Sequence, residues 1–180
     1  MADLPPERLR ICHPFTYVGF DIFEPWSVST RRRGGQAESK WWMIMFSCLS
    51  SRAVHIEIIQ SLDTLSCIHA LRRFFALRGL VKQLRSDCGN NFISASKELR
   101  MDKKVQRYLR DQGCSWEFNP PHSSHQGGSW ERMIGVARRI LHSMFLQQNI
   151  CLTHKVLCTL MAEVTAIMNA RPLYRPRKKP

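Results

Sequence analysis

Acidic residues are scarce in this sequence of 180 residues, which has 14 Asp and Glu against 27 Lys and Arg and a formal charge of +13. A long hydrophobic run is also missing, because the longest apolar stretch, Trp41–Leu49, is far too short to span a bilayer. The opening residues, MADLPPERLR, contain no apolar segment of the kind found in secretory signals. We therefore expect a protein that neither enters a membrane nor is exported.

Closely spaced cysteine pairs are absent as well. The seven cysteines are odd in number and include no CxxC pair. This pattern argues against a disulfide framework and for reduced thiols in an intracellular compartment. Apolar residues at 44% and charged residues at 23% are values of a globular chain, and the length suits one domain.

The positive charge that is present gathers toward the end of the chain. Residues 131–180 hold nine Lys and Arg against two acids, a net charge of +7 out of +13. Together with a sequence pI near 10.0, this excess indicates a polyanionic partner, most simply nucleic acid. On charge alone, a generically basic protein without such a partner is the alternative.

The hydrophobic pattern predicts strands first and helices later. Alternating residues predict strands at Tyr17–Phe23, Trp41–Cys48 and Ala53–Ile59, and the polar stretch Thr30–Lys40 is interpreted as a hairpin connection. Further along we expect short strands at Val81–Arg85 and Ser115–Phe118, and helices at about 64–79, 96–109, 129–147 and 153–169. The order β-β-β-α-β-α-β-α-α predicts an α/β fold, a mixed sheet with helices packed against it.

Three acidic residues occupy unusual positions. Asp21 lies inside an apolar strand, Asp87 follows the exit of another strand, and Glu131 lies in the first turn of an amphipathic helix. A carboxylate within a strand is costly unless it is paired or bound to a metal, and three carboxylates together would require cations such as two Mg²⁺ ions. Each acid alone also has an ordinary explanation: an exposed strand position, a turn residue, or a first-turn Glu favoured by the helix dipole. Sequence order alone does not show whether the three acids lie together in the fold.

Short blocks of sequence connect these acids to a known family. In chain order the blocks are Val18–Phe23, Ser51–Glu57, Leu71–Phe74, Arg85–Phe92, Phe118–Pro121, Ser124–Arg132 and Asn169–Pro172. Over about residues 8–175 they closely resemble the integrase core of BEL/Pao-type retrotransposons. The resemblance implies an RNase H-like core over residues 15–170, with a five-stranded mixed sheet, preceded by a linker at 1–14 and followed by a basic, proline-rich tail at 171–180.

The resemblance also implies a reaction and a site. Asp21, Asp87 and Glu131 match the D,D,E triad, which would hold two Mg²⁺ or Mn²⁺ ions. The implied enzyme is a polynucleotidyl transferase that trims the 3′ ends of element DNA with water and then joins the freed 3′-OH to target DNA. It would be a homo-oligomer that binds both DNAs and acts in the nucleus, after a cytoplasmic particle stage.

Two residues depart from the family pattern. Cys88 stands where the family typically has Asn, and Glu24 where it often has Gly. Because Cys88 adjoins Asp87, the alternative is a catalytically silent nucleic-acid-binding protein derived from an integrase core. The intact triad favours the enzyme.

Candidate DNA contacts lie around the third acid. Helical spacing places Arg138 on the same face as Glu131, two turns further on, where a cation suits substrate phosphates. A solvated basic face is the alternative for Arg138. From the resemblance we assign further DNA contacts to His125, Gln126, Arg132 and Asn91.

Two side-chain groups near the predicted helices remain. Cys151, His154 and Cys158 share the spacing of one helix face, which permits metal ligation, but no fourth ligand is evident and buried thiols are the favoured interpretation. Trp130 directly precedes Glu131, and we expect its indole to pack the preceding loop against the core and so to orient Glu131.

Overall fold

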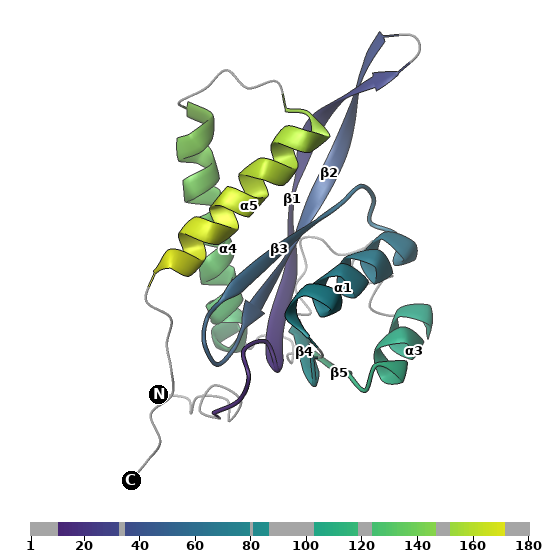
Figure 1. Ribbon diagram of the computed structural model, residues 1–180, viewed down its shortest axis with the longest axis vertical. Helices are drawn as coiled ribbons and strands as arrows, with labels where there is room; N and C mark the ends of the chain where they lie inside the picture. The colour runs from purple at the N-terminus through teal and green to yellow at the C-terminus, as the bar shows by residue number, and fades with distance from the viewer. Residues whose placement is uncertain are drawn as a thin grey trace.

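A computed structural model describes residues 11–32, 35–79, 81–86, 103–118, 124–146 and 152–171. Its centre is one five-stranded sheet with the order β3-β2-β1-β4-β5 (Figure 1). The strands are β1 (Tyr17–Arg32), β2 (Gly35–Cys48), β3 (Val54–Ile59), β4 (Gln83–Ser86) and β5 (Ser115–Phe118). The first three strands pair antiparallel, whereas β4 is parallel to both β1 and β5. The predicted mixed five-stranded sheet and its element order are confirmed.

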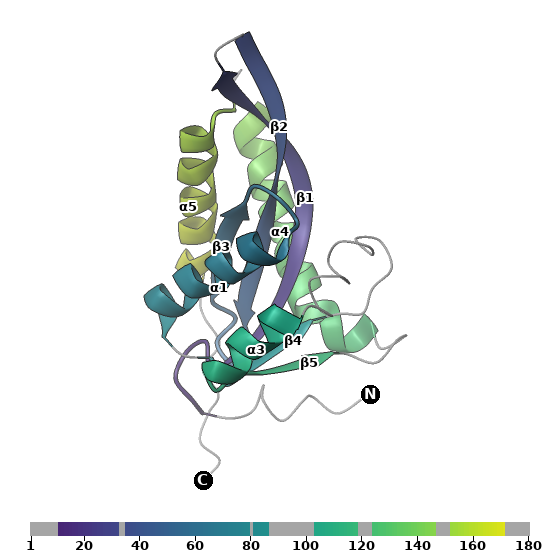
Figure 2. The ribbon, with the colours of Figure 1, turned by 90° about the vertical axis from the view of Figure 1, so that its right-hand side faces the viewer.

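Helices cover both faces of this sheet (Figures 1 and 2). One face carries α1 (Thr64–Arg78) and α3 (Lys103–Asp111), and the other carries α4 (Ser124–Leu146) and α5 (His154–Ala170). No helix of the described ranges is long and apolar enough to cross a bilayer.

Alternation along β1 assigns its residues to the two layers. Val18, Phe20 and Ile22 are buried in the core beneath α1 and α3, whereas Phe23 is buried in the core beneath α4 and α5. Because successive strand residues point to opposite faces, Asp21 belongs to the face that α4 and α5 cover. The strand that carries the first predicted acid therefore contributes to both cores.

Local capping fixes where α1 begins and ends. The side chain of Asp63 accepts a hydrogen bond of 2.8 Å from the backbone N–H of Ser66, and Gly79 follows the helix with φ of 87° and donates to the carbonyl of Phe75. Asp63 is therefore the N-cap residue of α1. Gly79 takes a backbone conformation that other residues adopt only with strain.

The stretch Thr30–Lys40 differs from its predicted role as a connection. β1 continues to Arg32 and β2 starts at Gly35, and the two remain paired throughout, with Thr30 opposite Ala37 and Ser27 opposite Lys40. The prediction missed this pairing because the two strands continue here as a ribbon beyond the rest of the sheet. Neither face of such a ribbon is buried along its whole length, so apolar and polar residues do not alternate regularly.

The start of α4 also differs from the prediction. The helix begins at Ser124 rather than Ser129, so part of the predicted loop Pro120–Ser129 is helical. Two glycines in this turn lower helix propensity by roughly 1 kcal/mol each, which explains why the sequence pattern pointed to a loop. Similarly, α3 is described from Lys103 on, whereas residues 87–102 lie outside the described ranges. The linker at 1–14 and the tail at 171–180 fall mostly outside them too and stay predictions.

Candidate active site

The first predicted acid lies on a strand whose parallel neighbour ends directly before the second predicted acid in the sequence. β1 and β4 are parallel, and Gly19 is in register with Arg85. Asp21 comes two residues after Gly19, and β4 ends at Ser86, directly before Asp87 in the sequence. Asp87 itself lies outside the described residues, so its convergence with Asp21 stays a prediction.

The third predicted acid is connected to β1 through its neighbour Trp130. A Cβ atom built on Gly19 would lie 2.1 Å from Cε3 and 2.6 Å from Cζ3 of the Trp130 indole. The indole thus fills the space that a side chain on Gly19 would need, and Trp130 is only 1% exposed. As expected from the sequence, Trp130 packs against the core, although its partner Gly19 was not predicted.

This contact places two carboxylate-bearing elements against each other. Glu131 directly follows Trp130 and is exposed, and Asp21 lies on the same face of β1 as Gly19. The Asp21 carboxylate is half-buried, and its Oδ1 accepts a hydrogen bond of 2.8 Å from the backbone N–H of Ile22. β1 and α4 therefore meet immediately before both predicted ligands.

The donor set suits a hard divalent cation. The two described candidates offer only carboxylate oxygens, which are the ligands that Mg²⁺ and Mn²⁺ prefer. Within the described ranges, no three His, Cys, Asp or Glu side chains are grouped so that they could hold a metal ion. The third predicted ligand, Asp87, lies outside those ranges, so a site of three carboxylates would depend on it.

An ion pair borders this region on the sheet. Arg85, in register with Gly19, donates from Nη2 to Oε2 of Glu117 on β5 at 3.1 Å. Side chains at paired positions share a face, so this guanidinium belongs to the face of Gly19 and Asp21. A cation held there favours ionised carboxylates nearby.

The predicted DNA contacts are partly described. Arg132 and Arg138 are exposed on α4, and α5 does not cover them. The backbones of His125 and Gln126 form part of the first turns of α4, but their side chains lie outside the description, as does Asn91 altogether. These assignments stay predictions.

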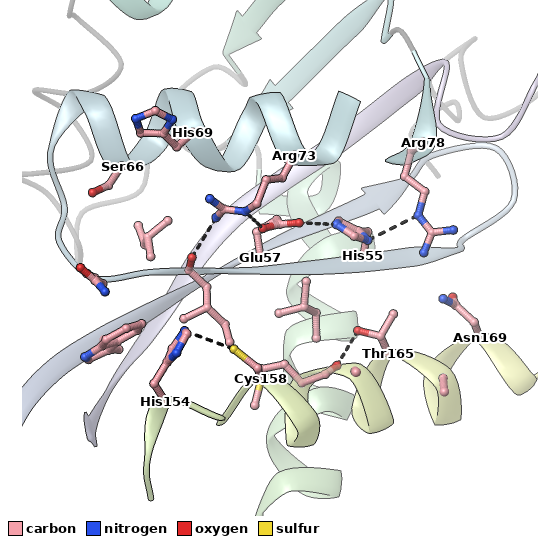
Figure 3. A pocket seen from close by; sticks show the side chains of 18 residues that line it. His55, Glu57, Ser66, His69, Arg73, Arg78, His154, Cys158, Thr165 and Asn169 are labelled. Carbon is pink, nitrogen blue, oxygen red and sulfur yellow. Dashed lines mark hydrogen bonds and ion pairs between the residues drawn. The ribbon is translucent and has the colours of Figure 1, made fainter. Parts of the chain in front are cut away.

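A second site, which the sequence did not reveal, is a groove along the edge strand β3. It lies between α1 and α5, has a volume of about 880 Å³, and is lined by polar residues that include His55, Glu57, Arg73 and Cys158 (Figure 3). The only sequence signal was the alternation in β3, which placed His55 and Glu57 on one face. Their partners lie on α1, and no local sequence pattern predicts contacts between these two elements.

A chain of polar contacts crosses this groove. Glu57 accepts from Nε2 of His55 at 2.7 Å and from Nε of Arg73 at 2.6 Å. Arg78 donates from Nε to Nδ1 of His55 at 3.4 Å. The His55 ring therefore lies between the Glu57 carboxylate and the Arg78 guanidinium.

This network controls the protonation of Glu57. Burial disfavours its charged form, but the hydrogen bonds and charges of His55 and Arg73 outweigh burial and hold the pKa of Glu57 below its usual value. The stabilisation that follows is complete above the ordinary Glu pKa of about 4.3 and is lost as the pH falls through the lowered pKa.

Glu57→Gln is therefore expected to lower the free energy of unfolding at pH 7 by about 1–3 kcal/mol, because His55 and Arg73 lose a charged acceptor. The difference from wild type should shrink as the pH falls through the lowered pKa of Glu57, where its carboxylate becomes protonated. Urea unfolding of both proteins, from pH 7 down to that pKa, measures it. The exposed Glu163→Gln is the matched control, and an equal loss in both variants would contradict the role of the network.

Only part of the trio Cys151, His154 and Cys158, whose spacing permits metal ligation, belongs to the described residues. Sγ of Cys158 lies 3.3 Å from Nε2 of His154, one turn apart on the helix, and Cys151 lies outside the described residues. The expectation of buried thiols is wrong for Cys158, which is exposed toward the groove. Desolvation raises the pKa of this thiol. The charge of Arg73 partly opposes this rise, and the charge of Glu57 adds to it.

Comparison with known proteins defines the class of this fold. No family model and no curated protein matches the sequence. The fold is that of integrase catalytic cores. The chain is similar to the HTLV-2 integrase catalytic core domain in complex with magnesium, with 14% identity in both of two forms. For the dimeric form the TM-score is 0.63 over 90% of this chain and 91% of that one, and for the trimeric form it is 0.60 over 87% and 86%.

A larger assembly contains the same fold. The chain is similar to one in the simian T-cell lymphotropic virus intasome in complex with PP2A regulatory subunit B56 gamma, with a TM-score of 0.67 and 13% identity. The match covers 95% of this chain and 54% of that one, so this chain spans about half the length of its neighbour.

Proposed function

We propose that this chain is the catalytic core of a BEL/Pao-type retroelement integrase, a polynucleotidyl transferase that depends on Mg²⁺ or Mn²⁺. The observation that carries the proposal is the contact of Trp130 with Gly19, which joins the elements of Glu131 and Asp21 beside the end of β4. The integrase-core fold and the sequence blocks around all three acids support it.

In this proposal Asp21, Asp87 and Glu131 would hold two divalent cations. When bound, such a pair activates the attacking oxygen and stabilises the leaving oxygen of an in-line phosphoryl displacement. The chain itself fixes Asp21 through the N–H of Ile22 and holds Glu131 at the surface, where a DNA strand reaches it. The basic face of α4 would bind the phosphates of that strand.

Two successive reactions follow from this arrangement. Water attacks a phosphodiester near the 3′ end of element DNA and releases a free 3′-OH. That hydroxyl then attacks a phosphodiester of target DNA, forming the new strand joint while a target 3′-OH leaves. Neither step requires a covalent bond to the protein.

The test is strand transfer or its reversal on branched DNA with Mg²⁺ or Mn²⁺. Product formation that requires the metal and is lost on replacing Asp21 by Asn supports the enzyme. The alternative, a silent nucleic-acid-binding derivative, is favoured by Cys88 beside Asp87, and it predicts DNA binding without any transfer. If Cys88→Asn gave transfer activity to an inactive chain, the lack of activity would be due to Cys88.

The basic face of α4 is tested by binding rather than by catalysis. Each lost phosphate contact lowers the salt slope of log K by about 0.9 on duplex DNA. Arg138→Ala is therefore expected to weaken binding to unrelated sequences alike and to reduce the slope by nearly one unit. The control Lys155→Ala, on α5, should do much less. A salt titration of duplex affinity measures both, and equal slopes for the two variants and wild type would make Arg138 a solvated charge only.

We also propose that the core assembles as a homo-oligomer and acts in the nucleus, after a cytoplasmic particle stage. The similar HTLV-2 cores are dimeric and trimeric, which supports assembly. Sedimentation of the purified chain tests the first proposal, and the location of a fluorescent fusion tests the second.

A further inference from the structure

Two cysteines meet where the chain enters the sheet. Residues 11–16, the dark purple stretch that leads into β1 in Figure 1, pass the turn that joins β2 to β3. In that turn the buried Ser50 hydroxyl accepts from Sγ of Cys12 at 3.7 Å and contacts Sγ of Cys48 at 3.3 Å. Both cysteines are free thiols. The two sulfurs are therefore separated by no more than these two contacts laid end to end.

The Cys48 sulfur is surrounded by hydrogen-bond donors. The backbone N–H groups of Phe15 and Ser51 donate to it at 3.2 and 3.4 Å. Since the Ser50 oxygen accepts from Cys12, its own proton is left to donate to Cys48. Burial alone would raise the pKa of Cys48, but these hydrogen bonds outweigh burial and lower the pKa. The thiolate, which is the reactive form of a cysteine, is therefore favoured at this position.

The backbone on both sides of this sulfur is held in a costly conformation. Phe15 and Arg52 both have a φ of 63°, a left-handed value that bulky residues rarely adopt. The N–H of Phe15 points at the sulfur, and the N–H of Arg52 donates to the carbonyl of Cys48 at 2.9 Å. The buried ring of Phe15 packs edge-on against Phe74, with centroids 5.6 Å apart, and lies 5.3 Å below the guanidinium of Arg78. Phe15 therefore anchors the entering segment beside the sulfur.

The two thiols differ in their access to water. Cys48 is only 1% exposed, whereas Cys12 is half-buried in a segment at the surface. Residues 11–13 belong to no helix or strand, so the Cys12 side chain can move toward Cys48 without breaking any strand pairing. A sulfur–sulfur bond of about 2 Å requires such an approach, with the Ser50 hydroxyl turning aside.

We propose that hydrogen peroxide converts Cys12 and Cys48 into a reversible disulfide, which pins the entering segment to the turn between β2 and β3. The thiolate of Cys12 attacks one peroxide oxygen, the O–O bond breaks, and the departing hydroxide takes up the thiol proton as water, which leaves Cys12 as a sulfenic acid. The thiolate of Cys48 then attacks the Cys12 sulfur, the S–O bond breaks, and a second water leaves. Two thiols and one peroxide thus give one disulfide and two waters, and the peroxide gains the two electrons that the sulfurs lose.

The proposed disulfide is separate from the candidate active site. Cys48 belongs to the core beneath α1 and α3, whereas Asp21 lies on the other face of β1. The inference therefore does not rest on the proposed function. The bond would close a loop that holds all of β1 and β2, so it would stabilise the fold mainly by restricting the unfolded chain.

A different role for the same contacts is purely structural. In that role the Cys48 sulfur only serves as the acceptor for two backbone N–H groups, those of Phe15 and Ser51. Such a role requires neither an oxidant nor the thiol of Cys12. The two roles therefore differ in what oxidation does to the folded chain.

The experiment treats the folded chain with hydrogen peroxide and maps its disulfides. Trypsin releases residues 11–31 and 41–52 as separate peptides, and each contains a single cysteine, Cys12 or Cys48. Remaining thiols are blocked before digestion, and mass spectrometry detects the linked pair. Thermal unfolding of the same samples is measured with and without dithiothreitol, which reduces a disulfide but leaves oxidised methionine unchanged. Cys12→Ser tests the pair, and Cys158→Ser, which removes an exposed thiol on α5, is the matched control.

Oxidised wild type and Cys158→Ser should both contain the linked peptides, and their Tm should rise by roughly 5–15 °C, a gain that dithiothreitol removes. Cys12→Ser should show neither the linked peptides nor the rise. Absence of the linked peptides from oxidised wild type would overturn the inference, and so would linked peptides without a reversible rise in Tm. An equal, reversible rise in Cys12→Ser would also overturn it, because Cys12 would then not be a partner in the bond.

Discussion

Glu131→Gln is expected to slow phosphoryl transfer by several orders of magnitude while the chain remains folded. The substitution keeps the shape and helix propensity of the side chain but removes one of the charges that would hold the cations. Because Glu131 is exposed and Gln has the same shape, the exchange should leave the packing unchanged, and relief of repulsion among carboxylates favours the folded state. Single-turnover transfer on branched DNA and thermal unfolding measure the two parts of this prediction.

Binding separates a chemical defect from a loss of substrate. Removing a negative charge near the phosphates should leave DNA affinity equal or higher, so the loss should appear in the rate of the bound complex. Glu163→Gln is the matched control, since Glu163 is likewise exposed and lies on α5. Glu131→Gln with a wild-type transfer rate would show that Glu131 is not a ligand.

The strands and helices of the core follow from local pattern. Val18, Phe20 and Ile22 alternate with the residues of the other face, and that alternation predicts a strand with one apolar face. The helical period of Leu71 and its neighbours similarly predicted α1, whose buried residues include Leu71 and Phe75. These signals are strong because each reports the burial of a whole face rather than a single contact.

The boundaries that were predicted wrongly are those where burial gives no such signal. The sequence is polar where β1 ends and β2 begins, so Thr30–Lys40 resembled a connection although Thr30–Arg32 pairs with Gly35–Ala37. The first turn of α4 contains Gly127 and Gly128, and its helical form depends on tertiary context that overrides propensity. In both places backbone hydrogen bonds, and not side-chain periodicity, define the element.

The sequence suggests the residues of the site but not the packing that supports them. Sequence blocks pointed to three acids, which stay predictions, and singled out Trp130, yet Gly19 drew no attention, because a glycine in a strand signals only that something approaches closely. The groove network is similar, since Glu57 and Arg73 meet only through the packing of α1 on β3. Complementarity between segments far apart in sequence is a property of the folded chain.

Gly19→Ala is expected to misplace Glu131 and to destabilise the fold. The added methyl would lie 2.1 Å from Cε3 of Trp130, so the indole, and with it the start of α4, would have to move. Such overpacking costs about 1–3 kcal/mol, and transfer should fall by more than the loss of folded protein explains. Gly135→Ala is the matched control, because nothing lies within 4 Å of a Cβ there and alanine should stabilise the helix by roughly 0.5–1 kcal/mol.

A second substitution distinguishes this clash from a general effect of Gly19→Ala on β1. Trp130→Leu removes the ring atoms that the methyl would strike, and alone it should destabilise by leaving a cavity. Combined with Gly19→Ala, it should cost less than the sum of the two single changes, because the methyl then occupies vacated space. Urea unfolding gives the coupling energy, and transfer rates show whether the double variant recovers activity over Gly19→Ala. Strict additivity of the two changes would mean that the indole does not set the position of α4 on β1. Effects of the same sign for Gly19→Ala and Gly135→Ala would mean the same.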